Sequence, residues 1–195
     1  RSLRDSAAAF LLLAPALLLL GVFGFYPLLY SIYMSLYGGK FLMGGYVGLA
    51  NFREALTGAP FWRSLLVTSY YAAGTVPITM FLSFSVAYAL FRIARARGFF
   101  RTIYFLPYVT SAVAAAMIWR AILNPQGGLA NSLLQLLGLA PQQWLLEPRG
   151  ALYVLTGGLF PEWFGPSLAL CCVILFDVWH AGGFMVVVFL AGLTA

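Results

Sequence analysis

The chain has 195 residues, of which 63% are apolar and 8% are charged. An ordinary soluble domain is roughly 45–50% apolar and about 25% charged, so this chain has too few polar side chains to cover a water-exposed surface. The formal net charge is +6, but the scarcity of charge excludes a disordered chain and a nucleic-acid-binding module. We therefore expect an all-α, polytopic membrane protein.

Apolar runs predict where the chain crosses the membrane. A spanning helix needs about 20 apolar residues, and four stretches meet this length: residues 7–36, 65–91, 103–123 and 167–193. Pro15 and Pro27 predict a tilt or kink in the first stretch, which is too long for a cleaved signal peptide. With no repeat or linker, residues 1–195 are expected to form a single transmembrane domain.

Basic residues predict the orientation of the spans. Six arginines lie before the first span or between the second and third: Arg1, Arg4, Arg92, Arg95, Arg97 and Arg101. The positive-inside rule places residues 92–102 and the N-terminus in the cytoplasm, so that residues 37–64 and 124–166 form outer loops. In the second outer loop, the leucines from Leu129 to Leu137 suit a helix at the membrane surface.

The apolar run at residues 151–160 is too short to cross a membrane. It is interfacial, re-entrant or a long start to the fourth span, and the sequence leaves these three readings open. In the third span, Trp119 and Arg120 are predicted to anchor the helix at the outer interface.

The inventory of reactive side chains does not suit an enzyme. His180 is the single histidine, and the sequence has no G-x-S-x-G motif whose serine it could activate as a base. The sequence also has no phosphate-binding loop. A metal would have to draw on Cys171, Cys172, Asp177 and His180, which lack a ligand-spaced motif. We therefore expect no catalytic residue, no metal and no cofactor in this chain, with any nucleotide chemistry supplied by another chain.

Four residues of the fourth span form the main candidate for a functional site. They follow the helical spacing i, i+3, i+4 and i+7: Asp177, His180, Ala181 and Phe184. An acid at the centre of a span is expensive in lipid, so Asp177 is expected to face protein or a water-filled path. The alternative is that Asp177 lies near the interface and pairs with His180 or with another subunit. The adjacent Gly182 and Gly183 permit close helix contact or a local break.

The second span carries weaker candidates for the same path: Tyr70, Tyr71 and Thr75. Aromatic rings stack on sugars and hydroxyl groups bond polar solutes. Interfacial tyrosines and threonines bonded to their own helix are, however, ordinary in spanning helices.

Taken in order, these segments resemble the membrane subunits of binding-protein-dependent ABC importers, in the carbohydrate-uptake branch. The most specific matches are FFRTIYFLP, WRAILNPQGGLAN and DVWHAGGFMVVVFLAGL. The chain departs from the family at Val67, where an asparagine commonly precedes the threonine, and over Leu155 to Pro166, which looks like an insertion. The family chain continues past a segment like FLAGLTA into a cytoplasmic coupling loop with a Glu-Ala-Ala signature, so we expect this chain to be truncated before that loop.

The resemblance implies part of a type I ABC importer transmembrane domain in a prokaryotic cytoplasmic membrane. Its implied partners are a second homologous permease subunit, cytoplasmic subunits that bind ATP and Mg²⁺, and an extracytoplasmic solute-binding protein. The solute would be a sugar or related polyhydroxylated compound. The span matching Asp177 to Phe184 contributes to the family's solute path, and a carboxylate there favours a neutral sugar over an anion.

Two other functions compete with the importer. One is a proton-coupled secondary transporter, in which Asp177 and His180 relay protons and no partner ATPase is needed. The other is a membrane scaffold in which every polar residue is structural.

Overall fold

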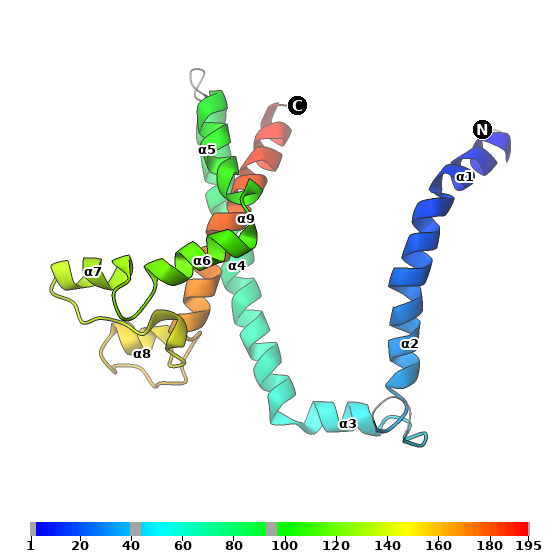
Figure 1. The fold of residues 1–195 in the computed structure, drawn as a ribbon, viewed down its shortest axis with the longest axis horizontal. Helices are drawn as coiled ribbons and strands as arrows, with labels where there is room; N and C mark the ends of the chain where they lie inside the picture. Colours follow the sequence, from blue (N-terminus) through cyan, green and yellow to red (C-terminus); the bar gives the residue numbers. More distant parts are fainter. Residues whose placement is uncertain (1–2, 40–43, 93–96, 195) are drawn as a thin grey trace. The chain divides into compact units, whose positions relative to one another are not determined.

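The computed structural model describes residues 3–39, 44–92 and 97–194. These residues form helices joined by turns and by isolated β-bridges, without a β-strand, so the predicted all-α class is confirmed. The chain divides into two compact units, Arg1–Ser64 and Leu65–Ala195, where the sequence predicted a single domain (Figure 1). Arg1 and Arg95, on which the expected orientation partly depends, lie outside the described residues.

One helical rod forms most of the first unit. It consists of α1 (Leu3–Leu20), the π-helical turn η1 (Gly21–Phe25) and α2 (Tyr26–Met34). Pro27 explains the π turn, because its ring has no room against the carbonyl of the preceding turn unless the helix widens. The apolar segment Leu11–Met34 has none of its residues buried, so lipid or other protein must cover it.

The end of this rod is capped by a side chain from the next helix. Asn51, in α3 (Ala50–Thr57), donates through Nδ2 to the carbonyls of Ser35 at 2.8 Å and Tyr37 at 2.9 Å. Carbonyls at a helix C-terminus have no partner within the helix, and these two bonds satisfy them. The NFREAL segment therefore folds as a helix that closes the end of the first span.

Two long helices form the core of the second unit: α4 (Ala59–Arg92), which starts in the first unit, and α9 (Leu168–Thr194). They run in the same direction in Figure 1. The buried residues of α4 recur about once per helical turn: Thr75, Thr79, Ser83, Ala87 and Leu90. The apolar part of this contact is one cluster: Ala87, Leu90, Val186 and Leu190.

The single span expected over residues 103–123 is two helices instead. Helices α5 (Arg97–Val109) and α6 (Ala112–Ile122) meet at a bend of 91°. Thr110 lies at the break, where its Oγ1 donates to the carbonyls of Pro107 at 2.6 Å and Leu106 at 3.2 Å and so satisfies carbonyls at the end of α5. Within the described residues, three helices meet the length and composition of a span, or four when the bent pair is taken as one.

After the bend, Trp119 of α6 contacts two rings of α9. Its ring lies 5.9 Å from Phe176 and 5.7 Å from Trp179, measured between ring centroids, so it packs against α9. The contact with Phe176 and Trp179 does not test whether Trp119 anchors α6 at the outer interface, so this stays a prediction. Arg120 is exposed.

Residues 124–167 fold into a small lobe around α7 (Leu129–Leu136), the 3₁₀ turn η3 (Trp144–Leu146) and α8 (Ala151–Leu155). Asn131 is its central residue and is 3% exposed. Its Nδ2 donates to the carbonyls of Pro125 and Gln142, and its Oδ1 accepts from the backbone N–H of Gln142 and from Nε1 of Trp144. These bonds hold Trp144 at a φ of 45°, a strained value for a bulky residue.

The lobe returns directly to the start of α9. Gly150 and Ser167 form a β-bridge, and the N–H of Ala151 donates to the carbonyl of Pro166 at 2.9 Å. Helix α8 is therefore separate from α9, which excludes the reading of residues 151–160 as a long start to the fourth span.

The segment around the ion pair of buried Glu147 and exposed Arg149 joins the lobe to α9 through its backbone. Glu147 is 4% exposed, and its carboxylate accepts two hydrogen bonds of 2.7 Å from the guanidinium of Arg149. The carbonyls of Glu147 and Arg149 accept the N–H groups of Ala169 and Leu168. The hydrogen bonds from Arg149 lower the pKa of Glu147 below its usual value of 4.5, although desolvation acts in the opposite direction.

This lowered pKa predicts how stability depends on pH. A carboxyl whose pKa is lower in the folded state stabilises the fold above its unfolded pKa, and this stabilisation is lost as the pH falls through the folded value. Thermal unfolding in detergent, measured from neutral pH into the acid range, should show the wild type more stable than Glu147→Gln at neutral pH. The difference should shrink below pH 4.5. A difference that stays constant with pH would contradict this assignment.

Candidate functional site

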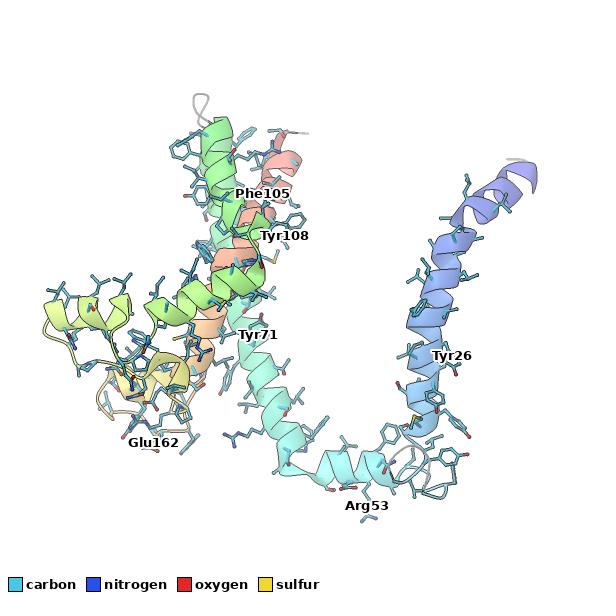
Figure 2. The ribbon with its side chains drawn as sticks, viewed as in Figure 1. Tyr26, Arg53, Tyr71, Phe105, Tyr108 and Glu162 are labelled. Carbon is cyan, nitrogen blue, oxygen red and sulfur yellow. The ribbon has the colours of Figure 1, made fainter. Side chains whose placement is uncertain are left out.

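A hydrogen bond between α4 and α9 is the centre of the candidate site. The hydroxyl of Tyr71 donates to Oδ2 of Asp177 at 2.8 Å, and both side chains are partly buried. Figure 2 labels Tyr71 midway along α4. The structure thus places a carboxylate and its hydrogen-bond donor within two apolar helices. The partner of Asp177 is Tyr71, whereas one alternative from the sequence was a pair with His180.

Hydroxyl side chains continue from Tyr71 along the α4 face that meets α9. Thr75 is 8% exposed, Thr79 is 7% exposed, and neither Oγ1 has a hydrogen-bond partner. Ser83 donates from Oγ to the carbonyl of Gly182 at 3.0 Å. Together with Tyr71 these residues form a polar seam, here defined as Tyr71, Thr75, Thr79 and Ser83. A buried hydroxyl without a partner is expensive, so the seam offers sites for water or for a polar solute.

The remaining predicted residues of α9 meet α5. The ring of Phe184 stacks on Tyr108 with the centroids 5.0 Å apart, and Tyr108 lies 6.4 Å from His180. His180 also stacks on Phe176 at 5.6 Å, and its Nε2 is buried without a hydrogen-bond partner. Figure 2 shows Tyr108 near the end of α5, where the chain bends into α6.

Glycines permit these close helix contacts. A Cβ at Gly183 would collide with the backbone carbonyl oxygen of Tyr104 in α5. A Cβ at Gly74 in α4 would meet a side-chain carbon of Ile174 at 2.8 Å. Helix α9 runs without interruption through Gly182 and Gly183, so the prediction of close helix contact is confirmed and the alternative of a local break is wrong.

The structure brings together some predicted residues and not others. Asp177 is hydrogen-bonded to Tyr71, and the rings of His180 and Phe184 both contact the ring of Tyr108. Ala181 lies between these positions on α9 and is partly buried. Tyr70 makes no hydrogen bond to Asp177 in the described part of the chain.

Sequence reasoning missed two parts of this arrangement. One is Ser83, which continues the four-residue spacing of Tyr71, Thr75 and Thr79, so the sequence contains a signal for it. Tyr108 has no such signal, because its place depends on how α5 packs against α9.

A cavity of about 440 Å³ lies between α4, α5 and α9. Its walls are mainly apolar and include Ser83, Tyr104, Trp179 and Gly182, but none of the four residues predicted on α9. The cavity therefore borders the polar seam without containing the Tyr71–Asp177 pair.

The thiols of Cys171 and Cys172 are free. Within residues 3–39, 44–92 and 97–194, no three histidine, cysteine or acidic side chains lie close enough together to hold a metal ion.

The helices and the buried polar seam define a polytopic α-helical membrane protein. Its fold is that of an ABC transporter transmembrane domain: a chain of a bacterial alginate ABC transporter, solved in complex with an alginate-pentasaccharide-bound periplasmic protein, superposes with a TM-score of 0.69. The match has 20% sequence identity and covers 98% of this chain and 58% of that one.

The sequence relatives are named as ABC transporter permeases. A probable ABC transporter permease protein of Pyrococcus horikoshii is 30% identical over 94% of this chain and 58% of its own length. The trehalose/maltose transport system permease protein MalF of Thermococcus litoralis is 27% identical over 98% of this chain and 60% of its own. No family model matches the sequence. The chain is homologous to ABC transporter permeases, as the sequence motifs predicted, and it spans about three-fifths of the length of these relatives.

The contact at Gly183 leads to a test of how α9 is positioned. Gly183→Ala forces a methyl group against Tyr104 and should lower the free energy of unfolding by about 1–3 kcal/mol, the usual effect of overpacking. The matched control is Gly192→Ala in the same helix, where a Cβ meets open space. Thermal unfolding in detergent measures both variants. Equal unfolding temperatures for the two variants would show that α5 and α9 do not pack closely at Gly183.

Proposed function

We propose that this chain is part of the permease subunit of an ATP-driven importer that moves a sugar or related polyhydroxylated solute across the cytoplasmic membrane. The observation that carries the proposal is the Tyr71–Asp177 pair within two membrane-length helices. Acids inside spanning segments are rare and usually mark a solute or ion path. The homology to ABC transporter permeases supports a solute path, and a relative named for trehalose and maltose supports a sugar.

Each residue has a chemical role in this proposal. Asp177 offers its Oδ1 to solute hydroxyls while Tyr71 holds Oδ2, so the carboxylate is oriented before the solute arrives. Phe184, which is 39% exposed, presents an apolar face to a sugar ring, and Tyr108 supports it by stacking. His180 and Ala181 complete the same face of α9.

The charge of the site favours a neutral solute. The partner of Asp177 is a neutral phenol, and among the described residues no cation forms an ion pair with this carboxylate. An uncompensated carboxylate repels an anion, more strongly within a membrane than in water. Alginate, named for the transporter of similar fold, is an acidic polysaccharide, so the solute proposed for this chain differs in charge from the one named for that transporter.

The partners follow from the importer architecture. A soluble receptor delivers the solute to residues 37–64 and 124–166 on the outer side, as the periplasmic protein in the alginate complex suggests. A second homologous permease subunit completes the path, and cytoplasmic subunits bind ATP and Mg²⁺. The N-terminus and residues 92–102 face the cytoplasm, because the arginines gather there.

Replacing Asp177 with asparagine tests the proposal. Asp177→Asn keeps the shape and removes the charge, so apparent solute affinity should weaken roughly ten- to a hundredfold, the value of a charged hydrogen bond. The measurement is ATP-dependent uptake of radiolabelled trehalose, maltose and other neutral sugars by the complete permease with its ATPase and binding protein in proteoliposomes.

Ser85→Ala is the control, because Ser85 is an exposed residue of α4 whose hydroxyl bonds only its own helix. This variant should transport like the wild type. Unchanged affinity in Asp177→Asn would remove this residue from the solute path. Uptake that needs a proton gradient and no ATP would favour the secondary transporter instead.

A further inference from the structure

Helix α7 has an exposed face made only of leucine. Leu129 is 65% exposed, Leu133 is 60% exposed, and Leu136 and Leu137 are 83% and 74% exposed. Their spacing of i, i+4, i+7 and i+8 places all four on one side of the helix. A surface of this kind is unfavourable in water and indicates contact with a partner or a membrane.

The lobe fixes the direction in which these leucines point. Asn131 lies on the opposite side of α7, is 3% exposed and uses both its amide nitrogen and its carbonyl oxygen in hydrogen bonds to the lobe. Rotating α7 to bury the leucines would break these bonds. The leucine face therefore stays turned away from the lobe.

Charge is absent from the surrounding sequence. The stretch from Ala121 to Leu146 contains no lysine, arginine, aspartate or glutamate. A helix that met water on its outer side would normally carry charged residues there. The composition instead suits a neutral helix lying against lipid.

The position of α7 in the second unit matches the boundary of a membrane. The preceding helix α6 lies beside α9, where Trp119 contacts Phe176 and where Leu123 and Cys172 line one small cavity. At the other end of α9, Thr194 lines a cavity with Arg101 of the basic segment expected at the cytoplasmic interface. The two levels lie roughly 27–33 Å apart along α9, close to the thickness of the hydrocarbon layer, about 30 Å. Figure 1 shows α7 running across the direction of α9, as a helix in the membrane plane does.

We propose that α7 is an interfacial membrane helix, with its leucine face in the acyl region of the leaflet nearest the Leu168 end of α9. The exposed apolar surface of α6 continues toward it, with Val113, Met117 and Ile118 each more than 60% exposed. The occupant of the leucine face is therefore phospholipid. This contact fixes the position of the lobe along the membrane normal relative to the spanning helices. The proposal does not depend on which solute is carried.

Spin labelling tests this placement. A nitroxide is attached at Leu133→Cys, on the leucine face, and separately at Gln135→Cys, an exposed residue on the other side of the helix, one turn after Asn131. The complete permease, with its other cysteines replaced, is reconstituted in vesicles of phosphatidylethanolamine and phosphatidylglycerol. Power-saturation EPR then compares collisions with oxygen, which concentrates in lipid, and with a water-soluble nickel chelate.

The label at Leu133→Cys should be relaxed by oxygen and protected from nickel, while the label at Gln135→Cys should be relaxed more by nickel. Leu136→Cys, at the most exposed of the four leucines, repeats the test should labelling at residue 133 disturb the fold. Relaxation of the leucine-face labels by nickel would show that the face meets water and would overturn the proposal. Immobile labels protected from both reagents would overturn it in favour of a protein partner.

Discussion

The absence of water in the bilayer core is the constraint on which this structure depends. A polar side chain there must find its partner within the protein, because lipid offers none. The hydroxyl of Tyr71 and the carboxylate of Asp177 meet this requirement across two helices. Ser83 and the carbonyl of Gly182 meet it again further along the same contact. These two bonds set the register of α4 against α9, and the apolar cluster of Ala87 and Val186 packs beyond them.

The same contact organises what surrounds it. Once α9 is held against α4, Gly183 allows α5 to approach its backbone, and this approach places Tyr108 on Phe184. The bend after α5 then leads the chain into α6 and the lobe, and the carbonyls of Glu147 and Arg149 in the lobe accept hydrogen bonds from the start of α9. In the solute path that we propose, the carboxylate of Asp177 and the stacked rings of Tyr108 and Phe184 lie along the same helix, an arrangement that suits a hydroxylated solute with an apolar ring face.

How well the sequence predicts each part of the structure depends on how far apart in the sequence the interacting residues lie. Asp177, His180 and Phe184 were recognisable because helical spacing alone places them on one face. Their partner Tyr71 was a weaker candidate, since its bond to Asp177 joins positions 106 residues apart and depends on packing. The bend at Thr110 was missed because the prediction used the average hydropathy of residues 103–123, which hides the local break signal of Pro107, Thr110 and Ser111. The lobe was the least predictable, because Asn131 organises it through four hydrogen bonds to loop residues that have no periodic pattern.

A double-mutant cycle on Tyr71 and Asp177 tests the central claim most directly. The free energy of unfolding in mixed micelles is measured for the wild type, Tyr71→Phe, Asp177→Asn and the double variant, and the coupling energy is the departure from additivity. Hydrogen bonds between membrane helices couple by about 0.6 kcal/mol on average and by at most about 1.7 kcal/mol, and a value in this range is predicted. A coupling energy of zero within error would mean that the contact does not hold α4 to α9.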